Sequence, residues 1–210
     1  MRPADPPSAA IRRLFGDIDI YLFDQLARGR FDTRRRVVDV GCGGGRNLRY
    51  LLADGYDCAG IDADPRAIAA VRREAEALGR PDVLDGFVVG AADALPWPDA
   101  AFDAVICSAV LHFAEDADHF GRMVTEIWRV LAPEGLFFAR LASTIGLDGF
   151  GGAAGRRVRL PDGSDRFVVD EAMLLDWTAR LGGSLADPLK TTNVQQMRCM
   201  TTWCMLRRRA

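Results

Sequence analysis

The chain has 210 residues, enough for one domain with a substantial core but too few for two of ordinary size. Apolar residues make up 49% of it and charged residues 27%, which is typical of a folded globular protein. The formal net charge of −2 lacks the basic excess with which nucleic-acid binders hold phosphate, so it argues against a nucleic-acid partner. We expect residues 1–10 to be a flexible lead-in and residues 11–210 to form a single domain, as a monomer or a homodimer.

Cysteine and histidine usage predicts no metal site. The five cysteines include no Cys-x-x-Cys pair, and the two histidines, His112 and His119, are too few and too poorly spaced for a recognisable zinc site. The start of the chain lacks the apolar core of a signal peptide, and no apolar run approaches the roughly 20 residues that cross a bilayer. These features predict a cytoplasmic protein with no membrane association.

Strands and helices alternate along the first two thirds of the chain. Short apolar runs predict strands, and apolar residues three or four positions apart predict helices. Strands are expected at 36–40, 58–61, 87–89, 102–108 and 136–141. Helices are expected at 11–26, between the glycine-rich loop 41–45 and Gly55, at 64–79 and at 118–131. Asp64 and Pro65 suit the cap and first residue of the third helix.

The last third of the chain has a different pattern. Residues 143–165 hold six glycines, too many for a packed element. Asp170 is expected to cap a helix that ends at Gly182, and two final strands are expected at 185–192 and 197–206. Alternating strands and helices predict a parallel sheet with helices on both faces. The expected fold class is therefore α/β, a doubly wound, mostly parallel, seven-stranded sheet.

The first strand, loop and helix carry the clearest chemical signal. Gly41, Gly43 and Gly45 allow a tight turn and let a ligand lie against the backbone. Asp62 ends the next strand, where a carboxylate can accept hydrogen bonds from both hydroxyls of a ribose. A glycine loop followed by this acid is typical of nucleoside binding, and the two features do not by themselves identify the nucleoside.

Two further residues favour S-adenosylmethionine over a dinucleotide. The dinucleotide pattern Gly-x-Gly-x-x-Gly needs glycine at position 46, where this chain has Arg46. Asp39 lies in the strand that leads into the loop, where its carboxylate would repel a pyrophosphate but suit an ammonium group. S-adenosylmethionine has a ribose, an amino-acid end and a sulfonium cation, and it has no phosphate.

The segments around these residues resemble class I S-adenosylmethionine-dependent methyltransferases. The similar segments are Val37-Val38-Asp39-Val40-Gly41-Cys42-Gly43-Gly44-Gly45, Gly60-Ile61-Asp62-Ala63-Asp64-Pro65, Ala92-Asp93-Ala94-Leu95-Pro96-Trp97, Phe102 to Ser108, Val110 to Phe113 and Arg129 to Gly135. Together they cover roughly half of the chain, in the order of the family's motifs. The resemblance implies the Rossmann-like methyltransferase fold, with S-adenosyl-L-methionine as cofactor.

The same resemblance implies roles for single residues. Gly41 and Gly43 would lie along the methionine part of the cofactor, and Asp39 would hold its ammonium group directly or through water. Asp62 would bind the ribose and Ala63 the adenine face, while Asp93 would accept from the adenine amino group. The backbone carbonyl of Ser108 would face the ammonium or sulfonium end. The complete set of expected cofactor-binding residues is Asp39, Gly41, Cys42, Gly43, Gly45, Asp62, Ala63, Asp93, Ala94 and Ser108.

Methyl transfer needs little from side chains, because a sulfonium methyl is already activated and positioning supplies most of the rate. A general base is needed only when the acceptor loses its proton with poor driving force. His112 sits where members of the family often place a residue that faces the acceptor, so it is the candidate catalytic residue. The alternative interpretation of His112 is a hydrogen-bonded structural histidine.

The acceptor is expected to be a small molecule. The chain has neither the Asn/Asp-Pro-Pro-Tyr/Phe motif of amino-directed DNA enzymes nor the Pro-Cys nucleophile of cytosine-C5 enzymes. The stretch from Gly43 to Asp57 is similar to tellurite-resistance methyltransferases, over a short segment only. Two other functions stay open, a nicotinamide-dependent Rossmann oxidoreductase and a non-catalytic module that binds S-adenosylmethionine.

Acceptor selection is expected to depend on two segments outside the motifs. One is the N-terminal helix from Ile11 to Leu26, with Asp19 and Gln25 on its exposed face. The other is the glycine-rich stretch 143–165, because the chain that leaves the fifth strand emerges beside the ligand crevice of a doubly wound sheet. A surface loop without function is the alternative interpretation of that stretch.

Overall fold

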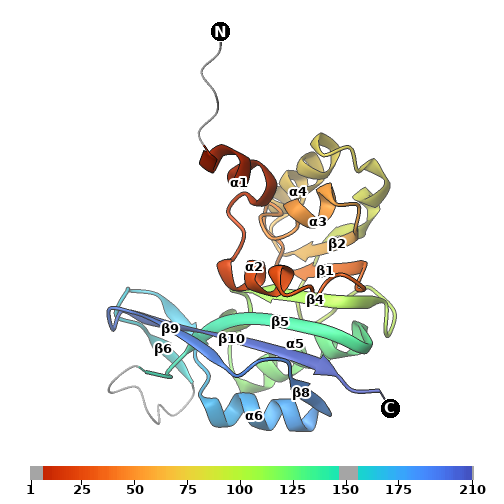
Figure 1. Ribbon diagram of the computed structural model, residues 1–210. Helices are drawn as coiled ribbons and strands as arrows, with labels where there is room; N and C mark the ends of the chain where they lie inside the picture. Colours follow the sequence, from red (N-terminus) through yellow and green to blue (C-terminus); the bar gives the residue numbers. More distant parts are fainter. Residues whose placement is uncertain (1–6, 147–155, 210) are drawn as a thin grey trace.

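The computed structural model describes residues 7–146 and 156–209, and Figure 1 shows the arrangement of their helices and strands. The α-helices are α1 (Pro7–Phe15), α2 (Ile20–Ala27), α3 (Arg49–Ala53), α4 (Pro65–Ala77), α5 (Ala117–Val130) and α6 (Glu171–Arg180). The strands are β1 (Arg36–Val40), β2 (Asp57–Asp62), β3 (Phe87–Val89), β4 (Phe102–Ser108), β5 (Leu131–Ser143), β6 (Arg157–Arg159), β7 (Asp165–Phe167), β8 (Gly183–Leu185), β9 (Lys190–Val194) and β10 (Arg198–Arg207). Two short 3-10 helices are η1 (Pro81–Gly86) and η2 (Leu111–Phe113).

The main sheet has the strand order β3-β2-β1-β4-β5-β10-β8, and β9 also pairs with β10. Strands β3, β2, β1, β4 and β5 run parallel, whereas β10 is antiparallel to β5, β8 and β9. This arrangement confirms the doubly wound, mostly parallel α/β fold. Eight strands fill the seven expected positions, because β8 and β9 lie end to end along the same edge of β10.

Alternate residues of the central strands pack on opposite faces of the sheet. On one face Val38, Val105 and Phe137 contact α5 and α6, and on the other Val37, Ile106 and Phe138 pack with α2, α3 and α4. Side chains of successive strand residues point to opposite faces, so a strand that is buried on both faces is apolar throughout. With helices packed on both faces of the sheet, the carboxyl ends of its parallel strands lie along one flank of the molecule (Figure 1).

Several expected boundaries differ from the structure. The N-terminal helix is two helices, because the chain turns at Gly16 (φ +57°) and Asp19 caps a new helix, α2. Residues 7–10, expected in the lead-in, belong to α1, and residues 1–6 lie outside the described part. The expected strand 185–192 is divided between β8 and β9 around Pro188, which has no backbone N–H to donate to a sheet.

The stretch 143–165 contains ordered structure that the glycine count did not predict. Strands β6 and β7 form a hairpin, and Gly163, with φ +83°, lies in its turn. Leu160 of this stretch packs with Val168, Ala142 and Cys199 in a small third core. Residues 147–155, with most of the remaining glycines, lie outside the described residues. No helix within the described ranges is long and apolar enough to cross a membrane.

Trp203 of β10 provides a test of the core next to α6. Its side chain is fully buried, its Nε1 donates to Thr178 Oγ1 at 3.0 Å, and its ring meets the edge of Phe137 with centroids 5.3 Å apart. We expect Trp203→Ala to lower the free energy of unfolding by about 3–5 kcal/mol, because it removes a large buried ring and leaves a cavity. Leu175→Ala on the exposed side of α6 is the control, with an expected change within about 0.5 kcal/mol in denaturant unfolding. Equal effects of the two substitutions would contradict this packing.

Candidate functional site

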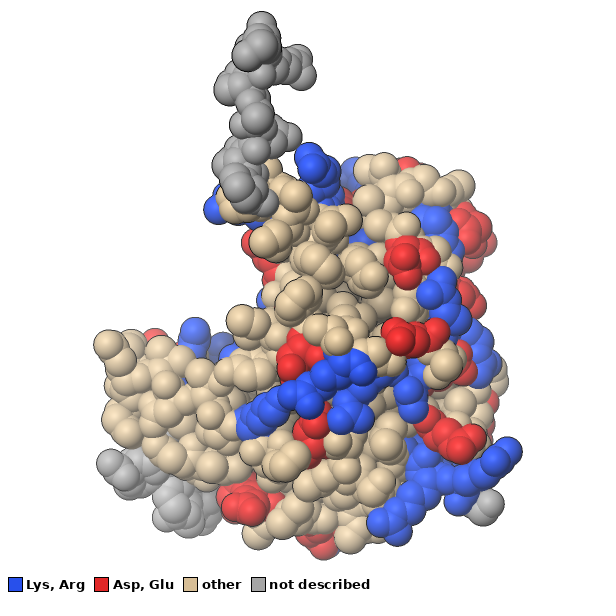
Figure 2. All heavy atoms as spheres, viewed as in Figure 1, with Lys and Arg blue, Asp and Glu red and all other residues tan. Residues whose placement is uncertain are grey.

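The candidate site lies where the chain leaves β1 and β4 toward opposite faces of the sheet. Ligands of open α/β sheets bind at this reversal of strand order, outside the carboxyl ends of the strands. A cavity of about 450 Å³ opens there, with Gly41, Asp62, Ala63, Ala109 and Phe113 among its lining residues. We call it the switch-point cavity. Figure 2 shows that the molecule is hollowed on this flank, between the body that carries α1 and the arm formed by β9 and β10.

The backbone of the glycine loop has conformations that residues with a side chain would adopt only with strain. Gly41 has φ +73°, and a Cβ atom on it would collide with Val110. Gly43 has φ +53° and faces open space, so a ligand can lie against its backbone. Gly45, with φ +87°, turns toward α4, where a Cβ would come within 2.6 Å of Val71. Gly41 and Gly43 therefore belong to the cavity side of the loop, and Gly45 sets the packing of the loop on α4.

Asp62 joins this loop to the end of β2. Its Oδ2 accepts a hydrogen bond from the Gly43 N–H at 2.9 Å, and its Oδ1 accepts from the Asp64 N–H at 2.9 Å. Each carboxylate oxygen has a second lone pair that can accept from a ligand hydroxyl. Ala63, the next residue, is exposed and lines the same cavity. The acid and the alanine expected at the nucleoside thus lie together at the cavity wall.

Asp39 is a buried carboxylate in the strand that leads into the glycine loop. Its side chain is 1% exposed, and neither carboxylate oxygen has a hydrogen-bond partner in the described part of the chain. Burial raises the pKa of Asp39 to about 8, and the charge of Asp62 acts in the same direction. The charge of Arg46 and the amide of Asn47 lower the pKa of Asp39, but by less than burial raises it. The Asn47 amide lies near Asp39 without hydrogen-bond geometry. An unpaired buried carboxylate is costly, so this position favours a cationic ligand group.

Three other expected cofactor residues lie at the margin of the switch-point cavity. Asp93 Oδ2 is 3.6 Å from Nε2 of His119, which lines the cavity, and 3.6 Å from Nε of Arg122. Ala94 is exposed and follows Asp93 outside the lining. Cys42 points its side chain into the core under Gly60, so only its backbone is available to a ligand. Burial raises the pKa of the Cys42 thiol.

Ser108 and Asp19 meet at the carboxyl end of β4. The Ser108 hydroxyl donates to Asp19 Oδ2 at 3.0 Å, and Nη1 of Arg140 in β5 donates to the same oxygen at 3.1 Å. The Asp19 backbone N–H donates to Asn47 Oδ1 at 3.1 Å. Asp19 is therefore 3% exposed, contrary to its expected position on an open helix face. The turn at Gly16 explains this difference, because it directs the start of α2 into the sheet.

Gln25, the second residue expected on the exposed helix face, is buried as well. Its side-chain Nε2 donates to Asp187 Oδ2 at 3.0 Å, and its Oε1 accepts from the Cys204 thiol at 3.6 Å. α2 packs against the sheet on this side, so the expectation that Asp19 and Gln25 are available to an acceptor is wrong for both.

His112 lies in a second cavity of about 350 Å³, which shares Ala109 and Phe113 with the first. We call it the arginine cavity, because Arg140, Arg166 and Arg198 line it. His112 is 5% exposed, and its Nδ1 has no hydrogen-bond partner within the described ranges. Burial, together with the charges of Arg166 and Arg198, lowers the pKa of His112 to about 4. The imidazole is therefore neutral at neutral pH.

The sequence did not predict the three arginines of this cavity or the role of Ala109, which follows Ser108. Ala109 has φ +64°, and its N–H donates to the Arg140 carbonyl at 2.7 Å, so the chain bends sharply between the two cavities. The arginines come from β5, β7 and β10, far apart in sequence. Only their placement in the folded sheet and hairpin brings them together, and no local motif signals it.

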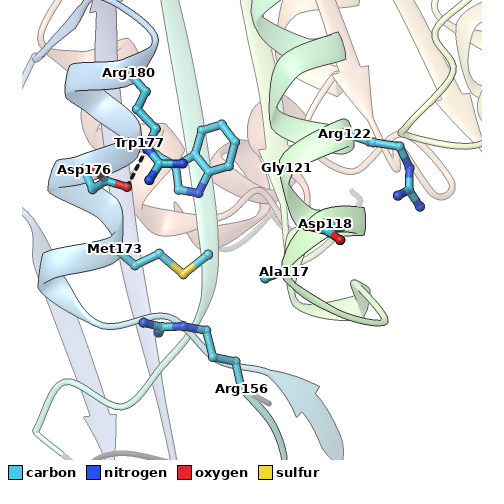
Figure 3. Close-up of a pocket in the computed structure, with 9 residues that line it drawn as sticks. All are labelled: Ala117, Asp118, Gly121, Arg122, Arg156, Met173, Asp176, Trp177 and Arg180. Atoms are coloured by element: carbon cyan, nitrogen blue, oxygen red, sulfur yellow. Dashed lines mark ion pairs between the residues drawn. The ribbon is translucent and has the colours of Figure 1, made fainter. Parts of the chain in front are cut away.

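A further groove, of about 540 Å³, lies between α5 and α6, away from the strand ends (Figure 3). Met173 and Trp177 of α6 face Ala117 and Gly121 of α5 across it. Arg180 forms an ion pair with Asp176 at 2.8 Å, drawn as a dashed line. This groove shares no lining residue with the other two cavities, so its size alone gives it no part in the site.

The switch-point cavity fits S-adenosylmethionine better than a dinucleotide. The unpaired carboxylate of Asp39 suits an ammonium group, Asp62 has free lone pairs for ribose hydroxyls, and the open backbone at Gly43 leaves room beside them. The carboxylate of Asp62 at this end of the sheet would repel a pyrophosphate.

Comparison with known proteins identifies methyltransferases among the relatives of this chain. Residues 38–139 match the methyltransferase domain family. The chain is 38% identical over 104 residues to a demethylmenaquinone methyltransferase of Thermus thermophilus, covering 48% of this chain and 44% of the relative. It is 33% identical over 148 residues to a malonyl-[acyl-carrier protein] O-methyltransferase of Halorhodospira halophila, covering 67% and 47%. The chain thus spans less than half the length of these curated relatives.

Among solved structures, the fold is similar to magnesium protoporphyrin IX methyltransferase from Synechocystis PCC 6803 with bound SAH. The TM-score is 0.64 at 18% sequence identity, over 90% of this chain and 81% of that chain. At this identity the likeness is one of fold. The local likeness to tellurite-resistance methyltransferases stays a prediction.

The raised pKa of Asp39 makes folding stability depend on pH. The unfolded carboxyl loses its proton near pH 4, whereas the folded one keeps it up to about pH 8. Between these values the folded state binds more protons, so stability falls as pH rises, by up to about 1.4 kcal/mol per pH unit from this group. We expect the stability of the wild type relative to Asp39→Asn to decrease from pH 5 to pH 8 in denaturant unfolding. A difference that is constant over this range would contradict the burial of an unpaired Asp39.

Proposed function

We propose that this chain, whose residues 38–139 match the methyltransferase domain family, is a class I S-adenosylmethionine-dependent methyltransferase that transfers a methyl group to a small-molecule acceptor. The observation that carries the proposal is the unpaired buried carboxylate of Asp39 beside the Gly41–Gly45 loop and Asp62. The names of the two relatives, which refer to demethylmenaquinone and to a malonyl group on acyl-carrier protein, support an acceptor other than nucleic acid. We propose a monomer or a homodimer as the working form.

In this proposal the residues of the switch-point cavity hold the cofactor. Asp39 pairs with its ammonium group, directly or through water, and Asp62 accepts from the ribose hydroxyls. Gly41 and Gly43 give it backbone to lie against, Ala63 covers the adenine face and Asp93 accepts from the adenine amino group. Bound S-adenosylmethionine supplies an electrophilic methyl group on a sulfonium cation.

The chain's own contribution to the rate is positioning and the exclusion of water. Ala109 and Phe113 line both cavities, so a ligand in each would meet at these residues. His112 is proposed as the group that takes the acceptor's proton, because its imidazole lines the arginine cavity and is neutral at neutral pH. With the cofactor in the switch-point cavity and the acceptor in the arginine cavity, the methyl group faces the boundary between them.

The test of function is methyl transfer from labelled S-adenosylmethionine to a panel of thiols, phenols, amines and chalcogen oxyanions. Transfer to any member supports an enzyme. Tight cofactor binding without transfer to any acceptor would favour the non-catalytic binding module. Saturable binding of NAD in place of S-adenosylmethionine would favour the oxidoreductase and overturn the proposal.

Asp62→Ala separates cofactor binding from folding. We expect it to weaken binding of S-adenosylhomocysteine by roughly 10- to 100-fold in calorimetry, because charge-assisted contacts of about 1.5–3 kcal/mol are lost and the Gly43 N–H loses its acceptor. The matched control is Asp64→Ala, which removes the N-cap of α4 and an ion pair with Arg66 but does not alter the cavity lining. It should cost about 1 kcal/mol of stability and leave affinity within about twofold. Unchanged affinity in Asp62→Ala would show that the ribose is not at Asp62.

His112→Phe tests the catalytic role of the imidazole while it keeps a ring against Phe113. Turnover should fall about 100-fold with S-adenosylhomocysteine affinity unchanged, since only the proton acceptor is lost. Because the pKa of His112 is about 4, the acting base form is fully present above pH 5 and is lost as pH falls through about 4. The wild-type kcat at saturating cofactor should therefore be level from pH 5.5 to 7.5. Full turnover in His112→Phe would overturn the role, and an inflection of the wild-type kcat near pH 6.5 would contradict the lowered pKa of His112.

A further inference from the structure

The arginine cavity gathers positive charge from three separate strands. Arg140 comes from β5, Arg166 from β7 and Arg198 from the start of β10, and all three line the same cavity of about 350 Å³. Asp162 is the acidic residue in the lining, and Ser164 adds a hydroxyl. Three guanidinium groups around a small cavity repel one another, so their arrangement needs a compensating charge.

The compensation within the protein is incomplete. Arg140 pairs with buried Asp19 at 3.1 Å, yet its Nε is buried without an acceptor in the described part of the chain. Arg198 is 3.5 Å from Asp162, beyond a normal hydrogen bond. Arg166 has no ion pair among the described residues and lies with its Cζ 4.8 Å from the centre of the Phe113 ring. Three cations thus face two carboxylates, and one positive charge is left over.

The walls that carry these arginines are firmly held. Leu160, which follows β6, and Val168, which follows β7, pack against Ala142 and Cys199. Arg157 Nη1 donates to the Ala114 carbonyl at 3.0 Å, which ties the hairpin to the chain after η2. Because these contacts fix the backbone on both walls, an anion has to order only the arginine side chains, which lowers the cost of binding in conformational entropy.

We infer that the arginine cavity binds a carboxylate of the methyl acceptor, so that the acceptor is a small organic acid. This inference rests on the proposed function for the position of the methyl group. The planar guanidinium fork suits a carboxylate, and a cavity of about 350 Å³ is of a size that suits a small molecule. The surplus charge lies on Arg166, so the acid group is placed at this guanidinium, and a second part of the acceptor can extend to Ala109.

The position of the guanidinium groups also indicates which atom of the acceptor receives the methyl group. A carboxylate whose lone pairs are held by guanidinium groups is a weak nucleophile, so the reacting heteroatom is a second group at the Ala109 end of the acceptor. Its lone pair forms the bond to the methyl carbon as the carbon–sulfur bond breaks, and that electron pair stays on sulfur. The proton of the heteroatom goes to His112 in the same cavity.

The inference is tested by calorimetry on protein saturated with S-adenosylhomocysteine. The titrants are three matched acid and amide pairs, namely 4-hydroxybenzoate and 4-hydroxybenzamide, 3-hydroxypropionate and 3-hydroxypropionamide, and mercaptoacetate and mercaptoacetamide. We expect at least one acid to bind about tenfold or more tightly than its amide. Arg166→Gln should weaken binding of that acid about tenfold, with a smaller loss in Arg198→Gln, which shares its charge with Asp162.

Arg159→Gln is the matched control, since Arg159 lies on the same hairpin, pairs with Asp165 and does not line the cavity. It should leave acid binding within about twofold, and all three variants should keep the affinity for S-adenosylhomocysteine. Equal binding of acids and amides, binding of neither, or equal losses in all three variants would overturn the inference. Failure of S-adenosylhomocysteine to bind would instead overturn the proposed function, and the acids would then be titrated into cofactor-free protein.

Discussion

The hydrogen bond from the Gly43 N–H to the Asp62 carboxylate is the contact on which the site depends. It joins the loop after β1 to the end of β2, and the neighbouring Gly41 and Cys42 N–H groups donate to the Ile61 carbonyl of the same strand. The loop is therefore held open along its ligand side while its other side packs on α4. Asp39 lies in the strand leading into this loop with both carboxyl oxygens unpaired, because the same folding that shapes the cavity removes water from the carboxyl group.

The two cavities have opposite electrostatic character. Asp39 and Asp62 make the switch-point cavity suit a cation, whereas Arg166 leaves the arginine cavity with positive charge. The two cavities adjoin at Ala109 and Phe113, which line both of them and follow β4 in the chain. A cationic donor and an anionic acceptor would each be drawn to a different side of this boundary, and their reacting groups would meet there.

The sequence predicted the parts of the molecule that depend on neighbouring residues. The alternation of strands and helices, the glycine loop and the acid at the end of β2 follow from local patterns, and the structure has each of them. The burial of Asp19 was missed because it depends on a turn at Gly16 and on Arg140, 121 residues away. The arginine cavity could not be predicted at all, since the pairing of β10 with β5 and the position of the β6–β7 hairpin decide it.

The most direct test of the central claim is a crystal structure of the protein with S-adenosylhomocysteine. The account predicts the ribose hydroxyls at the Asp62 carboxylate, and the amino group over the Gly41–Gly43 backbone, bound to Asp39 directly or through one water. The sulfur should then face the boundary at Ala109 and Phe113. A ligand found in the groove between α5 and α6, or one whose ribose lies away from Asp62, would contradict the account.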